Sequence, residues 1–204
     1  SINSGGHAFQ ALGVLAHVGQ PEYEGGRQSG QRLVAAGTAH ALCVNHEVGN
    51  VALDLRCQGL EDALTEAGGT VSVLAVDLTD PEDARQRVRG SLLADPSIDG
   101  ILTLATAGAE PTLQALEELE RSGDIPAGTF DLSPEVLESV MDGAMLFALD
   151  QQQYLQGYLP VVLLTKYLET GTVPGGGYPI PTGPVFITAE NAGSVMRLTE
   201  EGIR

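Results

Sequence analysis

Polar residues stand at the ends of the predicted strands of this sequence. They are Asn3, Ser4, Asn45, His46, Glu47, Asp77, Thr106, Asp131, Asp150 and Gln151. Arg56 falls about two turns into the helix after His46, near enough to lean back over the same edge. A neutral, polyhydroxylated ligand needs such a mixture of amide, carboxylate and guanidinium groups, because each of its hydroxyls both donates and accepts hydrogen bonds. A phosphate would fit this set poorly.

The sequence lacks the motifs of nucleotide and catalytic sites. No GxGxxG follows a predicted strand, no GxxxxGK[ST] is present, and Gly175 to Gly177 lie in a loop rather than before a helix. The segment 46–50 is not an HExxH zinc pair because it ends in Asn, and no GxSxG is present. Adjacent strand residues such as His46 and Glu47 point to opposite faces, which disfavours an acid–base pair. We therefore expect a binding protein with no enzymatic activity, no metal and no cofactor.

Each of these polar residues also has a purely structural interpretation. Asp131 could be a turn residue ahead of Ser133, Asn45 an Asx-turn residue and Asn50 a helix cap. Taken singly, these interpretations are favoured. Their convergence on one edge of a sheet would favour a binding site instead.

Strand and helix patterns alternate at short spacing along the chain. The predicted strands are 13–20, 40–46, 70–77, 99–105, 127–131, 144–149 and the end of a Pro/Gly-rich loop at 173–188. The predicted helices are 23–37, 50–69, 80–95, 109–123, 133–143, 152–171 and 189–204. This alternation predicts an α/β fold with a doubly wound parallel sheet and helices on both faces. Ligands of such sheets bind beyond the carboxyl ends of the strands, where the polar residues stand.

The composition supports one or two aliphatic cores and disfavours some partners. The 204 residues are 43% hydrophobic and include no Trp. A formal net charge of −17 repels phosphate backbones, so no nucleic-acid binding is expected of this segment. No apolar run approaches the ~20 residues that a membrane span needs.

Two cysteines, Cys43 on a predicted strand and Cys57 on the helix that follows, are too few for a disulfide scaffold or a zinc site. A helix packed on its own strand could bring them within bonding distance. The alternative is a pair of buried thiols that act as small hydrophobes. The residues alone leave the two interpretations even, and an exported protein would favour the disulfide.

Four segments together resemble the type I periplasmic sugar-binding proteins. They are CVNHEVGNVALDLRCQGLEDAL, ADPSIDGILTLATAGAEPTLQAL, GTFDLSPEVLESVMDG and FALDQQQYLQGYLPVVLL. They follow in that family's order over almost the whole chain, and the resemblance points to the actinobacterial sugar ABC-transporter type. The same fold serves the effector domains of LacI-type repressors.

The resemblance implies two lobes joined by three crossovers. The opening SINSGG is similar to the last strand of the first lobe, so we expect a fragment that lacks most of that lobe. The implied division is residues 1–20 as a remnant of the first lobe with the first crossing, 21–149 as the second α/β lobe, 150–178 as a crossing and a helix that returns to the first lobe, and 179–204 as a C-terminal strand and helix.

The resemblance also assigns residues. Arg56 matches the arginine that binds sugar hydroxyls, Asp131 the carboxylate that accepts from them, and Gln151 the hinge glutamine. Asn3 matches a ligand position, Ser4 stands where many members have Arg, and Thr106 stands near a frequent Asn or Asp. The aromatic residue that stacks on the sugar from the second lobe is absent. With His46 from the strand ends, the predicted ligand-binding residues are Asn3, Ser4, His46, Arg56, Thr106, Asp131 and Gln151.

The function implied is capture of a simple sugar or polyol between two lobes and its delivery to an ABC permease. The protein would be extracytoplasmic, in the periplasm or as a cell-surface lipoprotein with a signal peptide. This implied export favours a disulfide between Cys43 and Cys57, which we therefore predict. The alternatives are an effector-binding domain of a LacI-type transcription regulator and a receptor for a sugar-like signal such as the furanose autoinducer. Upstream sequence would separate them, since a signal peptide favours transport and a helix-turn-helix favours regulation.

Overall fold

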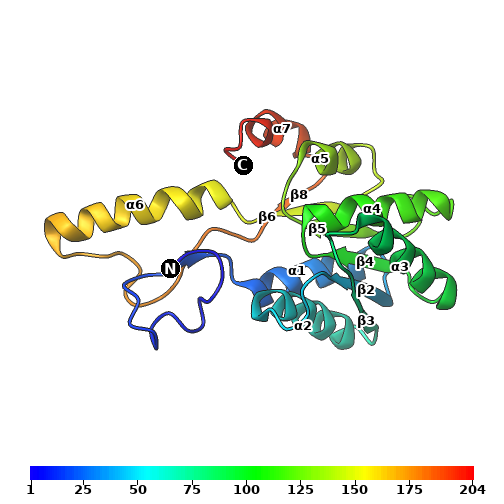
Figure 1. Cartoon of the computed structure of the whole chain (residues 1–204), viewed down its shortest axis with the longest axis horizontal. Helices are drawn as coiled ribbons and strands as arrows, with labels where there is room; N and C mark the ends of the chain where they lie inside the picture. The colour runs from blue at the N-terminus through cyan, green and yellow to red at the C-terminus, as the bar shows by residue number, and fades with distance from the viewer.

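The computed structural model describes residues 1–204, and its largest element is a six-stranded sheet (Figure 1). The strands are β1 (Val18–Gly19), β2 (His40–Asn45), β3 (Thr70–Ala75), β4 (Gly100–Thr103), β5 (Ala127–Phe130), β6 (Phe147–Asp150), β7 (Ile180–Pro181) and β8 (Val185–Ile187). The helices are α1 (Glu22–Ala35), α2 (Val51–Glu66), α3 (Pro81–Ala94), α4 (Thr106–Glu118), α5 (Pro134–Met141), α6 (Gln153–Thr170) and α7 (Ala192–Glu200). The strand order of the large sheet is β3-β2-β4-β5-β6-β8. The predicted α/β fold with a doubly wound sheet is therefore confirmed.

Helices cover both faces of this sheet, because successive strand residues point to opposite sides. In β2, Ala41 and Cys43 join a core under α1 and α2, whereas Leu42 and Val44 join a core under α3 and α4. A third core lies between α5, α7 and the strands β6 and β8; Ala148 and Ile187 belong to it. The carboxyl ends of the parallel strands are thus held at one edge by packing from both sides.

The structure differs from three of the predicted elements. The predicted strand 13–20 is reduced to Val18–Gly19, because only these two residues pair with β7. The predicted helix 109–123 begins earlier, at Thr106, and carries Pro111 inside it rather than in its first turn. The last strand, β8, runs antiparallel to β6, so the sheet is parallel except at that edge.

A second, smaller part of the fold lies beside the large sheet. Strand β1 pairs in parallel with β7, and Ile2 bridges to Val18. Helix α6 extends away from the large sheet in Figure 1, with Gln156 as its one buried residue. None of the helices combines the length and the apolar character needed to cross a membrane.

Three short connecting segments run between the large sheet with its helices and the smaller part of the fold: residues 20–21, 151–152 and 182–184. Two of them are bonded to each other, since the Thr182 hydroxyl donates to the main-chain oxygen of Gln151 at 2.7 Å. Gln156 donates to the same oxygen at 3.1 Å. The polar residues of the candidate site gather around these segments.

Candidate ligand-binding site

Glycines bring helices α1 and α2 into close contact. A Cβ atom at Gly26 would lie 2.0 Å from the main-chain oxygen of Arg56, and one at Gly59 would lie 2.1 Å from that of Tyr23. Only glycine leaves room for such an approach of two backbones. The contact places Glu22, the first residue of α1, beside the Arg56 side chain on the buried face of α2.

Arg56 is 4% exposed and donates three hydrogen bonds. Its Nε donates to Glu22 Oε2 at 2.6 Å, its Nη1 to the main-chain oxygen of Leu104 at 2.9 Å, and its Nη2 to Gln151 Oε1 at 3.1 Å. The guanidinium carbon also lies 4.1 Å from the ring centroid of Phe130, on which the cation is held. A guanidinium has five N–H donors, so two of them are left for a ligand.

Asp131 continues this hydrogen-bond network. Its Oδ1 accepts from the side-chain amides of Gln151 and Gln153, the latter at 2.6 Å. Its backbone is left-handed, with a φ of 70°, which turns the chain away from β5. Burial raises the pKa of the Asp131 carboxyl, while the hydrogen bond from Gln151 and the charge of Arg56 act in the opposite direction. Oδ2 accepts no bond from the chain and is the acceptor that Asp131 can offer.

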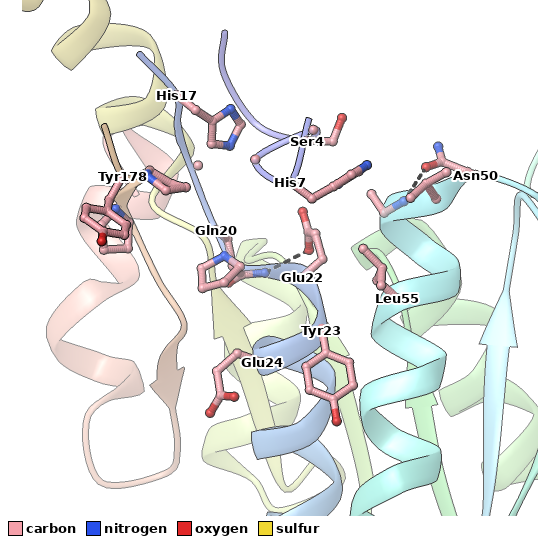
Figure 2. A pocket seen from close by; sticks show the side chains of 18 residues that line it. Ser4, His7, His17, Gln20, Glu22, Tyr23, Glu24, Asn50, Leu55 and Tyr178 are labelled. Carbon is pink, nitrogen blue, oxygen red and sulfur yellow. Dashed lines mark hydrogen bonds between the residues drawn. The ribbon is translucent and has the colours of Figure 1, made fainter. Parts of the chain in front are cut away.

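A cavity of about 710 Å³ lies between the N-terminal segment and the first turns of α1 and α2 (Figure 2). Its polar lining residues are Ser4, His7, His17, Gln20, Glu22, Tyr23, Glu24, Asn50 and Tyr178. The volume lies within the range of small-molecule pockets, roughly 300–1,000 Å³. Glu22 belongs both to this lining and to the network around Arg56, whereas Arg56, Asp131 and Gln151 do not line the cavity.

The other predicted site residues are placed differently. Ser4 lines the cavity, and Asn3 donates its main-chain N–H to Val18 at 3.0 Å; no hydrogen bond joins either residue to Arg56. His46 is half-buried, and burial lowers its pKa, as does the positive charge of Arg56. Thr106 lines a separate cavity of about 700 Å³ between α4 and α5. The structure therefore brings together Arg56, Asp131 and Gln151, and leaves Thr106 apart.

Several of the polar strand-end residues have structural partners. Asn45 accepts from the main-chain N–H of Glu47 at 2.9 Å, and Asp77 accepts from that of Thr79 at 2.8 Å. Asp150, fully buried, accepts from Arg204 Nε at 2.9 Å. These contacts hold the turns after β2, β3 and β6.

Sequence reasoning missed Glu22. Most of the predicted site residues stand at strand ends, whereas Glu22 follows Pro21 at the start of a helix. An acidic residue at that position is ordinarily a favourable partner of the helix dipole. The feature of the sequence that points to Glu22 as a site residue is its position directly after the first connecting segment.

Cys43 of β2 and Cys57 of α2 are joined by a disulfide, with an S–S distance of 2.05 Å. The bond attaches α2 to the sheet at the residue after Arg56. No group of three or more His, Cys, Asp or Glu residues is arranged to hold a metal ion.

Comparisons with known proteins agree with this fold. A family model described as a periplasmic binding protein domain matches residues 9–172. The xylose/arabinose-binding protein XylF of Sulfolobus acidocaldarius is 30% identical over 187 residues, which are 87% of this chain and 45% of that protein. This chain thus spans less than half of the length of that relative.

Solved structures of other proteins are also similar to this chain. A carbohydrate transporter from Acidothermus cellulolyticus 11B, in complex with myo-inositol, is 32% identical with a TM-score of 0.92, covering 100% of this chain and 69% of its own. A periplasmic ribose ABC transporter from Conexibacter woesei DSM 14684 shares the fold, with 22% identity, a TM-score of 0.81, and coverage of 91% of this chain and 63% of its own.

Proposed function

The chain belongs to the periplasmic binding protein domain family, and from this premise we propose that it captures a neutral sugar or polyol and delivers it to an ABC permease. The protein works outside the cytoplasm in this proposal, and binding involves no catalytic step. Support comes from the relatives, one of which is named for xylose and arabinose and another of which holds myo-inositol.

The network from Glu22 through Arg56 and Gln151 to Asp131 is the observation that carries the proposal. Glu22 directly follows the first connecting segment, and Gln151 lies within the second. A ligand bound to these side chains would therefore touch both connections at once. Its binding would be coupled to the relative position of the two parts that they join.

The charges of the network favour a neutral ligand. One guanidinium, Arg56, stands between the carboxylates of Glu22 and Asp131, so an added phosphate would meet more repulsion than attraction. The groups left open are two N–H donors of Arg56 and the Oδ2 acceptor of Asp131. A sugar or polyol can pair with both kinds, because its hydroxyls donate and accept.

The proposal assigns residues 21–149 to one lobe, and residues 1–20 and 150–178 to the other lobe and its crossings. Within residues 179–204, β7 pairs with β1 in the smaller part, whereas β8 pairs with β6 and α7 packs on α5, which supports assigning β8 and α7 to the lobe of the large sheet.

Calorimetry with the protein expressed from its complete reading frame tests the proposal. The panel contains xylose, arabinose, ribose, hexoses, myo-inositol and sugar phosphates. We expect a neutral member to bind, and Asp131→Ala to weaken it by about 2–4 kcal/mol, or on the order of 30- to 1000-fold, because its partners are left unpaired in a desolvated site. Glu117→Ala, which removes an exposed carboxylate beside the second cavity, is the control. Tight binding of a phosphorylated compound, or undiminished binding by Asp131→Ala, would refute the proposal.

A further inference from the structure

Glu22 is a buried carboxylate with one unpaired oxygen. The residue is 6% exposed, and its Oε2 accepts from Arg56 Nε at 2.6 Å and from Gln20 Nε2 at 3.3 Å. Its Oε1 is shielded from solvent and has no hydrogen-bond partner. Buried polar atoms in folded proteins are almost always paired, and an unpaired charged one is costly, so this oxygen calls for a partner from outside the chain.

The position of this oxygen indicates where that partner would lie. Glu22 lines the cavity of about 710 Å³ together with Ser4 and His7. Figure 2 shows its carboxylate directed toward the part of the cavity where Ser4 and His7 lie, and away from the Tyr23 side chain. Neither Ser4 nor His7 donates a hydrogen bond to it. A molecule in this cavity would reach Oε1 once the atoms that cover it shift.

The chemistry of the oxygen restricts the partner to a hydrogen-bond donor. Glu22 already neutralises the charge of Arg56 through Oε2, so its Oε1 presents the remaining acceptor capacity of a carboxylate. A hydroxyl can donate to it, whereas a ligand carboxylate or phosphate would be repelled.

We propose that Glu22 binds the ligand directly, with Oε1 accepting a hydrogen bond from one hydroxyl while Oε2 holds Arg56. This inference rests on the proposed function, since the ligand is the neutral sugar or polyol of that proposal. Glu22 contacts the ligand from the start of α1, directly after the first connecting segment, Gln151 contacts it from the second, and Asp131 contacts it from the end of β5. The recognised hydroxyl lies on the side of the ring that faces the cavity with Ser4.

The competing explanation is that Glu22 only positions Arg56. The variant Glu22→Gln separates the two, because its carbonyl oxygen can still accept from Arg56 while its amide N–H₂ replaces the acceptor at the Oε1 position. If Glu22 only positions Arg56, Glu22→Gln should lower the affinity for every ligand of a series by the same factor. If Glu22 binds the ligand directly, the loss of affinity should occur only for ligands that carry the recognised hydroxyl.

The experiment measures affinity by calorimetry for myo-inositol, xylose, and the monodeoxy analogues of each, with protein from the complete reading frame. Glu22→Gln should weaken the parent compound about 10- to 100-fold, as expected for loss of a hydrogen bond to a charged acceptor. For the analogue that lacks the recognised hydroxyl, the affinities of wild type and variant should agree within about 3-fold. The matched control is Glu117→Gln, which makes the same exchange at an exposed carboxylate outside this cavity, and which should change affinity less than about 2-fold.

Each outcome decides between the explanations. The same loss for the parent and all analogues, or undiminished binding by Glu22→Gln, overturns the inference and leaves the proposed function intact. Absence of binding of any panel member by the wild type overturns the proposed function and this inference with it. If thermal unfolding shows that Glu22→Gln does not fold, Glu22→Asp, which withdraws the carboxylate by one methylene, must show the same dependence on one hydroxyl.

Discussion

Asp131 destabilises the fold in its ionised form, and a bound hydroxyl donor would offset this effect. Burial is the largest cause of its raised pKa, which means that folding disfavours the charged carboxylate. A carboxyl group whose pKa is higher in the folded state than in the unfolded state lowers the free energy of unfolding as pH rises from the unfolded-state pKa to the folded-state pKa. Below that window both states carry the protonated group, and the cost vanishes.

We therefore expect Asp131→Asn to stabilise the unliganded protein at pH 7 and to have less effect at pH 3. Asparagine tolerates the left-handed backbone at this position, so the exchange should add little strain. Urea unfolding of wild type and variant at several pH values measures the difference. Glu117→Gln controls for the loss of one negative charge from an acidic surface. If wild type and Asp131→Asn differ in stability by the same amount at both pH values, the raised pKa of Asp131 is not the cause of the difference.

The residues that could be predicted from the sequence are those at strand ends or on a helix that leans over them. Asp131 and Gln151 are predicted from the first position and Arg56 from the second, and the structure joins the three by hydrogen bonds, while their role in binding stays a prediction. Glu22 could not be found in this way, because its importance depends on how closely α1 approaches α2. Thr106 stands at a strand end but faces another cavity, since the helix that it begins turns toward α5.

At the scale of the elements, the contact between α1 and α2 determines the geometry of the site. A methyl group at Gly26 would meet the main-chain oxygen of Arg56 at 2.0 Å, so the helices would have to separate. Separation would also pull Glu22 away from the Arg56 guanidinium, to which it is bonded at 2.6 Å.

We expect Gly26→Ala to lower the free energy of unfolding by about 1–3 kcal/mol through overpacking. The matched control is Gly90→Ala in α3, where an added methyl group would meet nothing within 4 Å. This control should raise stability by about 0.5–1 kcal/mol, because alanine favours a helix more than glycine does. Chemical denaturation of both variants provides the comparison. Equal effects of the two substitutions would show that the close contact between the helices does not limit stability.

The elements that the sequence predicted well are those with local signals. Asp80 and Ser133 cap their helices, each accepting a hydrogen bond from the main-chain N–H of the third residue that follows, and such caps are local features of the sequence. The direction of β8 and the pairing of β1 with β7 depend instead on partners that are distant in sequence. Local patterns carry no information about such partners, and for the same reason the apolar run at 13–20 was predicted as a longer strand than the structure contains.

At the scale of the whole molecule, two of the three connecting segments are coupled to each other. Gln152 donates from its side chain to the main-chain oxygen of Thr182, and the Thr182 hydroxyl donates to that of Gln151. Arg204 bonds to Asp150, at the end of β6, and so attaches the last residue to the same region. Segments 151–152 and 182–184 should therefore move together. The main-chain N–H of Thr182 also donates to the oxygen of Gly19, the residue before the segment at 20–21, at 3.1 Å, so this segment is linked to the other two.

Ligand binding at this junction should draw together the parts on either side of it. We expect saturating myo-inositol, or whichever neutral panel member binds best, to reduce the radius of gyration of the protein from the complete reading frame, as measured by small-angle X-ray scattering. At about 100 times Kd the ligand should contribute about 2.7 kcal/mol to stability. For a domain of about 150–250 residues that corresponds to a rise in Tm of roughly 5–10 °C.

Ribose 5-phosphate at the same concentration is the control, and it should change neither quantity because Glu22 and Asp131 repel an anion. The Asp131→Ala variant should lose both responses in parallel, since one network serves binding and closure. A rise in Tm without a change in the radius of gyration would show that the ligand binds to a preformed site, and that the connecting segments do not act as hinges.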